Sequence, residues 1–211
     1  MLISFPEMFR RHRIKSKGAL HLGANLGQEA QTYRSLGIQR VVWVEALPKV
    51  YEQLRRNVAR FPDSIALLAC ISDKDGAIVD FNEASNEGQS SSLLEFGTHA
   101  KAHPDTTFIA RHKMITQRVD TLFKEQGLEA WLPTGSFLNI DLQGAELMAL
   151  RGLGEVLTRF DYAYVEVNEE ELYTGCPLVG DINAFMFEKG FVGLESKMTK
   201  WKWGDRLYGR R

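Results

Sequence analysis

A glycine-rich segment near the start of the chain has the composition of a ligand-binding turn. Residues 21–27 read His-Leu-Gly-Ala-Asn-Leu-Gly and follow a short apolar stretch, 19–22, that predicts a strand. Residues 28–36 predict a helix that ends at Gly37. Glycine permits tight backbone turns, and the free N–H groups at the start of a helix can face a ligand. The segment is therefore a candidate site for a nucleotide-like molecule.

An acidic residue, Glu45, lies 22 residues after Gly23, at the end of a second predicted strand over 40–45. In α/β nucleotide-binding folds an acid at this place holds ribose hydroxyls. A dinucleotide also needs a G-x-G-x-x-G turn for its pyrophosphate, but Asn25 and Gln28 occupy the second and third glycine positions. S-adenosylmethionine carries no phosphate, so the tight turn and the ribose acid suffice. The spacing favours S-adenosylmethionine over a nicotinamide dinucleotide, and a plain strand–helix turn stays an alternative.

Two further acids are expected on the same rim of the sheet. Asp141 ends a predicted buried strand over 137–141, and Glu166 lies near the end of another over 162–167. In an open parallel sheet, the carboxyl ends of the strands line the ligand crevice. Because a buried carboxylate without a partner is costly, we interpret Asp141 as functional. Asp141 or Glu166 is the candidate general base, and the rival candidates are three loop histidines, His99, His103 and His112.

The same acids offer an alternative chemistry. Asp141, Glu166 and Asn168 could hold a divalent ion through hard oxygen ligands, and that ion would acidify a bound hydroxyl. No ligand spacing in the sequence demands a metal. We therefore assign no metal-binding residues and keep a divalent metal as the less favoured alternative.

Short apolar stretches alternate with amphipathic stretches along the chain, a pattern that predicts βαβ units and a parallel sheet. The pattern is lost between residues 82 and 116, which predicts a long loop with a helix near 93–103. Asp120 and Asp181 are the expected N-caps of two helices. Further strands are expected over 65–71 and 78–81 and in a C-terminal hairpin of 191–194 with 206–210; further helices are expected over 48–62, 119–126, 144–157 and 181–189.

Composition limits the class of protein. Of the 211 residues, 44% are hydrophobic and 25% are charged, which is typical of one globular domain. No apolar run approaches the roughly 20 residues that span a bilayer, and the N-terminus lacks the apolar core of a signal peptide. The 2 cysteines are too few for a disulfide framework. We therefore expect a cytoplasmic protein without a membrane span.

Charge is unevenly distributed although the net charge is only −1. Residues 1–17 hold five basic residues against one acidic residue, and residues 197–211 hold six against one. We predict a basic N-terminal extension over 1–17 and a single domain over 18–211. A non-catalytic relative of the fold could bind nucleic acid through such ends. Solvated termini are the favoured interpretation, so no nucleic-acid partner is expected.

Several motifs in order make the sequence resemble the FkbM family of methyltransferases over about residues 18–210. The resemblance implies an α/β, Rossmann-like class I methyltransferase fold with a mostly parallel seven-stranded sheet, a C-terminal antiparallel hairpin and the strand order 3-2-1-4-5-7-6. The motifs are 22–27 (Leu-Gly-Ala-Asn-Leu-Gly), 44–48 (Val-Glu-Ala-Leu-Pro), Leu54 with Asn57, 71–73 (Ile-Ser-Asp) with Gly76, 91–93 (Ser-Ser-Leu), 119–122 (Val-Asp-Thr-Leu), 140–146 (Ile-Asp-Leu-Gln-Gly-Ala-Glu) with Leu150 and Gly152, and Glu166 with 190–191 (Gly-Phe).

The activity that the resemblance implies is methyl transfer from S-adenosylmethionine, commonly to oxygen. We expect O-methylation of a sugar hydroxyl on a glycan or a glycosylated small molecule. Trp201 and Trp203 alternate with lysines, which predicts a half-exposed strand or, alternatively, a surface on which a sugar stacks.

The resemblance also implies which residues bind the cofactor. Its methionine end would lie against the turn, its ribose would be held by Glu45, and its adenine would lie against the segment after the third strand. A serine turn would close over it, and Asp141 with Gln143 would face its amino-acid or methyl end. The implied residues are Gly23, Ala24, Asn25, Gly27, Glu45, Ala46, Leu47, Ile71, Ser72, Ser91, Asp141 and Gln143.

Two positions depart from the family pattern. The family often has Asp where this chain has His21, and Lys where it has Asn139. A neutral imidazole at His21 could accept a hydrogen bond from the ammonium of the cofactor, whereas an imidazolium would repel it. We include His21 among the candidate cofactor-binding residues, with a packing role as the alternative.

Overall fold

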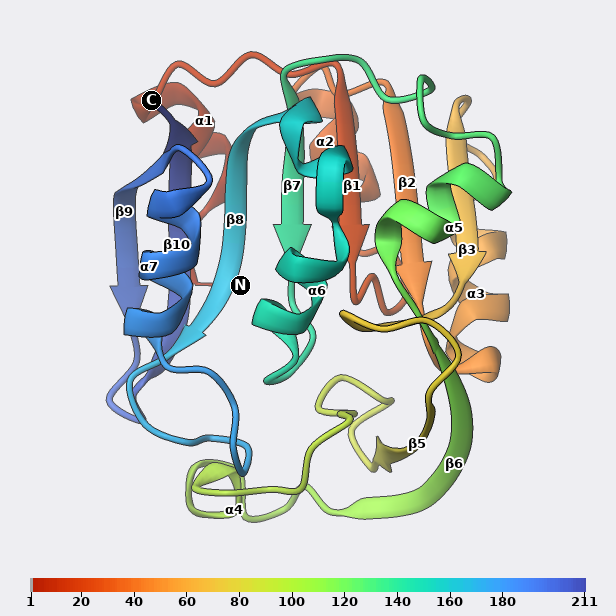
Figure 1. Ribbon diagram of the computed structural model, residues 1–211, viewed down its shortest axis with the longest axis vertical. Helices are drawn as coiled ribbons and strands as arrows, with labels where there is room; N and C mark the ends of the chain where they lie inside the picture. The colour runs from red at the N-terminus through yellow and green to blue at the C-terminus, as the bar shows by residue number, and fades with distance from the viewer. Residues whose placement is uncertain (1) are drawn as a thin grey trace.

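A seven-stranded sheet forms the centre of the computed structural model, which describes residues 2–211 (Figure 1). The strand order is β3-β2-β1-β7-β8-β10-β9, which is 3-2-1-4-5-7-6 when the strands of this sheet are numbered along the chain. Neighbouring strands are parallel except for β10, which is antiparallel to both β8 and β9. The expected sheet, hairpin and order are confirmed. The strands are β1 (Gly18–Leu22), β2 (Arg40–Glu45), β3 (Ser64–Leu68), β7 (Ser136–Ile140), β8 (Phe160–Asn168), β9 (Phe191–Met198) and β10 (Trp203–Arg210).

Helices cover both faces of this sheet, as Figure 1 shows. On one face α5, α6 and α7 pack against Leu20, Val42, Leu138 and Val165; on the other, α1, α2 and α3 pack against the residues that alternate with these. Strands β1 and β7 are buried along their whole length, which explains why apolar residues face both sides of the sheet, with His21 and Asn139 among the buried polar exceptions. The helices are α1 (Phe5–Arg11), α2 (Ala30–Ser35), α3 (Pro48–Val58), α5 (Val119–Glu125), α6 (Glu146–Gly152) and α7 (Val179–Glu188).

The N-terminal segment packs against the sheet. Phe5, Met8 and Phe9 of α1 are buried among aromatic side chains that include Phe137 and Tyr164. The division into an extension over 1–17 and a domain over 18–211 stays a prediction, but the apolar face of α1 belongs to the same core as the sheet.

The segment between β3 and α5 corrects the expected loop over 82–116. It contains β4 (Cys70–Ile71), β5 (Ile78–Ala84), α4 (His99–Ala102) and β6 (Phe108–Gln117), and β4, β6 and β5 form a second sheet. The single strand expected over 65–71 is therefore wrong, because β3 and β4 belong to different sheets. In Figure 1 this segment lies beyond the carboxyl ends of the parallel strands.

Helix ends differ from the expectation in three places. The helix expected over 144–157 ends at Gly152, and a 3-10 helix, η1 (Gly154–Arg159), follows it. Asp120 is not an N-cap; the cap is Arg118, and the carboxylate of Asp120 pairs with the guanidinium of that residue. Asp181 lies inside the first turn of α7 and accepts the N–H of the cap residue Leu178 at 2.9 Å.

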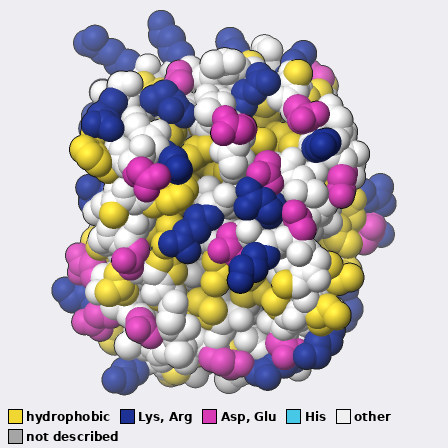
Figure 2. Space-filling view, viewed as in Figure 1, with side chains coloured by type: hydrophobic (Ala, Val, Ile, Leu, Met, Phe, Trp, Pro, Cys, Tyr) yellow, Lys and Arg dark blue, Asp and Glu magenta, His cyan; other side chains and the backbone are white. Residues whose placement is uncertain are grey.

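None of the helices within residues 2–211 is both long and apolar enough to cross a bilayer. On the face drawn in Figure 2, Lys and Arg side chains are interspersed with Asp and Glu side chains.

Candidate functional site

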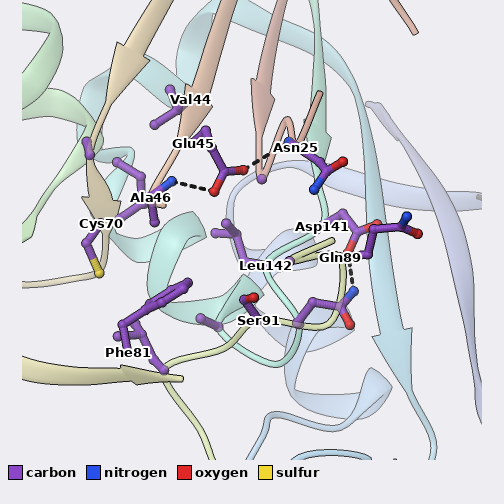
Figure 3. Close-up of a pocket in the computed structure, with 17 residues that line it drawn as sticks. Asn25, Val44, Glu45, Ala46, Cys70, Phe81, Gln89, Ser91, Asp141 and Leu142 are labelled. Carbon is purple, nitrogen blue, oxygen red and sulfur yellow. Dashed lines mark hydrogen bonds between the residues drawn. The ribbon is translucent and has the colours of Figure 1, made fainter. Parts of the chain in front are cut away.

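Two adjoining hollows lie at the carboxyl ends of β1, β2, β7 and β8. The first, the apolar slot, is bordered by Ala69, Cys70, Ile71, Phe81 and Leu142, with Glu45 at its edge (Figure 3). The second, the acidic cavity, has a volume of about 480 Å³ and is lined by Glu29, Asp141 and Glu166 among others. Residues common to the two hollows are Gly23, Asn25, Gln89, Asp141 and Gln143. A ligand that crosses this shared border can occupy both.

The turn after β1 requires glycine at its first position. Gly23 has a φ of +79°, and a Cβ there would lie 1.8 Å from the carbonyl oxygen of Asp141. The N–H groups of Gly23 and Ala24 both donate to the carbonyl oxygen of Val44, at 3.0 and 2.9 Å. The turn is thereby tied to β2 and to the end of β7, and its backbone is open to a ligand on the cavity side.

Glu45 is held by the backbone around it. Its carboxylate accepts the N–H groups of Asn25 at 3.0 Å and of Ala46 at 2.9 Å (Figure 3). It also accepts the N–H group of Leu47 at 2.9 Å. Burial raises the pKa of this carboxyl, and the three hydrogen bonds oppose that rise. Glu45 thus connects the turn after β1 with the start of α3, and it presents an oriented acceptor to the apolar slot.

A second tight turn follows β7. Gln143 has a φ of +52° and Gly144 a φ of +101°. The buried carboxylate of Glu146 accepts the N–H groups of Leu142 and Gly144 at 3.0 Å each, and Ser92 donates its hydroxyl to the Gln143 carbonyl at 2.7 Å. Burial raises the pKa of Glu146 to about 7. These contacts position the side chain of Gln143 in the cavity.

Gln143 lies between the two acids named as candidate bases. Its Nε2 donates to Oδ1 of Asp141 and, at 3.1 Å, to Oε2 of Glu166. Tyr173 in turn donates its hydroxyl to Oε1 of Gln143. Burial raises the pKa of both carboxyls, and the charge of Asp141 raises that of Glu166 further. Within residues 2–211, Oε1 of Glu166 has no hydrogen-bond partner.

His21 is a neutral residue of a buried polar cluster. Its side chain contacts the Tyr33 hydroxyl at 3.3 Å and Nδ2 of Asn139 at 3.0 Å. Burial lowers the pKa of His21 to about 3, so the imidazole is uncharged near neutral pH. The 3.8 Å separation between Nδ1 of His21 and the carboxylate of Glu29 is consequently not an ion pair.

The far wall of the acidic cavity comes from distant parts of the chain. Ser90 and His99 belong to the segment between β5 and β6, and Trp203 begins β10. His99 is stacked on Phe96 with ring centroids 4.1 Å apart, and burial lowers its pKa to about 4. His103 also lines the cavity.

The third histidine named as a rival base lies elsewhere. His112 is on β6, where its Nε2 is 2.6 Å from the carboxylate of Glu83, and it is not among the residues that line either hollow. Within residues 2–211, no group of three or more His, Cys, Asp or Glu side chains is arranged to hold a metal ion.

Most of the residues expected from the sequence border the two hollows. They are His21, Gly23, Ala24, Asn25, Glu45, Ala46, Ile71, Ser91, Asp141, Gln143 and Glu166.

Three expected residues do not line either hollow. A Cβ on Gly27 would meet Leu54 at 2.8 Å, so this glycine serves helix packing. Leu47 donates its N–H to the carboxylate of Glu45. The carbonyl oxygen of Ser72 packs against Gly152 of α6, where a Cβ would lie only 2.2 Å away from it.

Sequence reasoning missed several lining residues, including Glu29, Phe81, Gln89 and Leu142. Leu142 lies inside the recognised motif 140–146 and Glu29 lies two residues after the motif 22–27, so their proximity was a usable signal. Phe81 ends the strand expected over 78–81, and Gln89 falls in the segment whose pattern was lost.

Comparison with known proteins identifies the family. The family model described as Methyltransferase FkbM domain matches residues 21–192. The 2-O-methyltransferase NoeI of Sinorhizobium fredii is 27% identical over 163 residues, which cover 74% of this chain and 65% of that protein. The chain thus spans somewhat less than two thirds of the length of this curated relative.

Solved structures share the fold at low sequence identity. TrmK of M. capricolum, solved with S-adenosyl-homocysteine, has a TM-score of 0.54 and 8% identity over 100% of this chain and 70% of its own. Fibrillarin of Aeropyrum pernix, solved with S-adenosyl-L-methionine, has a TM-score of 0.51 and 12% identity over 92% of this chain and 66% of its own. The class I methyltransferase fold expected from the sequence is confirmed.

Proposed function

The chain belongs to the FkbM methyltransferase domain family, and we propose that it transfers a methyl group from S-adenosylmethionine to a hydroxyl of a neutral sugar. The acceptor would be a glycan or a glycosylated small molecule. The observation that carries the proposal is the pair of hollows joined at Gly23 and Asp141, one apolar with a ribose acid and one acidic.

The apolar slot fits the adenosine part of the cofactor. Ile71, Phe81 and Leu142 provide flat apolar walls for a base, and Glu45 is fixed where a ribose would need an acceptor. The slot opens across Gly23 into the cavity, so the methionine part would lie beside Asp141. The sulfonium supplies an electrophilic methyl group, and the lining carboxylates favour its positive charge.

The acidic cavity favours an acceptor without negative charge. Among residues 2–211, its lining contains the carboxylates of Glu29, Asp141 and Glu166 and includes neither Lys nor Arg. A phosphate or carboxylate on the acceptor would be repelled at this site. Trp203 offers a half-buried aromatic ring for an apolar sugar face, as in many carbohydrate sites. The name of the relative NoeI supports transfer to an oxygen at position 2 of a substrate.

Glu166 is the base that the geometry supports best. Its Oε1 is buried and has no hydrogen-bond partner among the described residues. Its Oε2 and Oδ1 of Asp141 each accept a hydrogen bond from Nε2 of Gln143. A carboxyl whose pKa is raised is a better proton acceptor from an alcohol than an ordinary one. Asp141 would keep that pKa raised, while Gln143 holds the two carboxyls in place. His99 is a weaker candidate, because its pKa is lowered to about 4.

The rival functions have less support. The turn lacks the glycine spacing for a pyrophosphate, which argues against a nicotinamide oxidoreductase. The acidic lining argues against nucleic acid as the molecule bound in the cavity. A cytoplasmic location stays part of the proposal.

Two measurements test the proposed function. Extracts of cells with and without the chain are compared by mass spectrometry, and we expect neutral glycans or glycosides heavier by one CH₂ unit when it is present. In parallel, purified chain is incubated with methyl-labelled S-adenosylmethionine and either neutral methyl glycosides or the corresponding sugar phosphates. Label on the sugar phosphates alone would contradict the proposed acceptor class.

A further inference from the structure

We propose that Glu29 provides the carboxylate that binds the α-ammonium group of S-adenosylmethionine. The inference rests on the proposed function, since it concerns the same cofactor. It assigns a binding role to a residue that lies outside the motifs recognised in the sequence. Glu29 is the N-cap residue of α2, directly after the ligand-binding turn.

The location of Glu29 is the first argument. Its side chain lines the acidic cavity together with Gly23, Ala24 and Asn25, and it is 15% exposed. A cofactor whose ribose is held by Glu45 and whose chain crosses the shared border at Gly23 brings its amino-acid end to this wall. The ammonium then needs an anionic partner on the side of the turn.

The state of the neighbouring side chains is the second argument. His21 lies beside Glu29, but its imidazole is neutral and contacts Tyr33 and Asn139. It therefore neither neutralises the Glu29 carboxylate nor presents a charge to the ligand. The other acids of the cavity, Asp141 and Glu166, both accept a hydrogen bond from the side-chain amide of Gln143.

Glu29 therefore stands out among the cavity acids. No charged side chain within residues 2–211 forms an ion pair with it; the nearby His21, 3.8 Å away, is uncharged. A partly buried carboxylate in this situation binds a cation strongly, because solvent screens the pair only weakly.

Three ligands separate this role from other roles of Glu29. S-adenosylmethionine has both the sulfonium and the ammonium, S-adenosylhomocysteine has only the ammonium, and 5′-methylthioadenosine has neither. We expect Glu29→Gln to weaken the binding of the first two ligands by about tenfold or more, as the loss of a charge-assisted contact does. The affinity for 5′-methylthioadenosine should stay within about twofold, because no group on it faces residue 29.

Titration calorimetry at low salt with the intact chain measures all three affinities. Glu129→Gln removes an exposed carboxylate far from the cavity and is the matched control, for which no ligand should change affinity. Retained binding of 5′-methylthioadenosine by Glu29→Gln also shows that the variant is folded.

Three outcomes would overturn the assignment. If Glu29→Gln binds S-adenosylhomocysteine as the wild type does, then Glu29 does not hold the ammonium. If all three ligands are weakened alike, then Glu29 acts through the shape of the turn. A wild-type chain that binds 5′-methylthioadenosine but not S-adenosylmethionine would also contradict it, whereas a wild-type chain that binds none of the ligands contradicts the proposed function itself.

Discussion

Replacing Glu45 by Gln keeps the size of the side chain and removes its charge. The carboxylate accepts two N–H groups on Oε1, from Ala46 and Leu47, and one on Oε2, from Asn25. An amide satisfies the first pair through its oxygen, and its NH₂ group then faces the N–H of Asn25. One partly buried donor is left without an acceptor, which costs about 1–3 kcal/mol of folding free energy.

Two magnitudes follow for Glu45→Gln. For a chain of this size, about 2 kcal/mol lowers the Tm by roughly 4–8 °C. The charged acceptor for the ribose is lost as well, which should weaken S-adenosylmethionine by about 10- to 100-fold. In contrast to Glu29→Gln, the binding of 5′-methylthioadenosine should fall in parallel, because this ligand retains the ribose.

Thermal unfolding followed by circular dichroism and calorimetric titration measure the two effects separately. Titrations are carried out well below the Tm of the variant, so that both chains are folded. A variant with the lowered Tm and an unchanged affinity for all three ligands would refute the reasoning, because Glu45 would then only brace the turn.

Three other substitutions give distinct results. Asp141→Asn leaves the base Glu166 in place, so turnover should fall by less than the roughly 100-fold that loss of a general base costs, while the chain still binds the cofactor. The acid limb of the rate profile should move to lower pH, because the charge of Asp141 raises the pKa of Glu166; an unmoved limb would contradict this coupling. Gly23→Ala should lower the free energy of unfolding by more than about 3 kcal/mol in urea titrations, since its Cβ would meet the Asp141 carbonyl, and near wild-type stability would contradict that. His21→Gln should make the free energy of unfolding depend less steeply on pH under acidic conditions. The pKa of His21 is about 3 in the folded chain against 6.5 for the free side chain, so between these values only the unfolded chain binds the proton. The free energy of unfolding therefore decreases as the pH is lowered. If its dependence on pH were equally steep in the variant, the assignment would be contradicted.

The sheet and the turn after β1 were predictable because their signals are local. Short, mostly apolar runs mark β1, β2 and β7, and Gly23 is demanded by a backbone geometry that few other residues adopt. Glu45 and Asp141 follow from their positions at strand ends. These features need no knowledge of distant contacts.

Strand β6 was missed because neither of its faces is uniformly apolar. Along Phe108–Gln117 the exposed side chains include Ile109, Arg111 and Ile115, and the less exposed ones include His112 and Thr116. The hydrophobic alternation that marks a half-buried strand is therefore absent. Met114, on the less exposed face, packs in a small cluster with Cys70 and Phe81 rather than on the main core.

The far wall of the cavity could not be predicted for a different reason. His99 and Trp203 are about a hundred residues apart in the sequence, and the long crossing from β5 to β6 and the terminal hairpin bring both to the cavity. The neutral state of His21 also depends on tertiary burial. The sequence shows a departure from the family pattern there, and the structure shows that the imidazole carries no charge.

The central claim is that the two joined hollows bind S-adenosylmethionine, and calorimetric titration of the wild-type chain with this cofactor tests it most directly. We expect one molecule bound per chain at micromolar concentrations of cofactor. The absence of binding heat at millimolar cofactor, in a chain shown to be folded by circular dichroism, would contradict the claim.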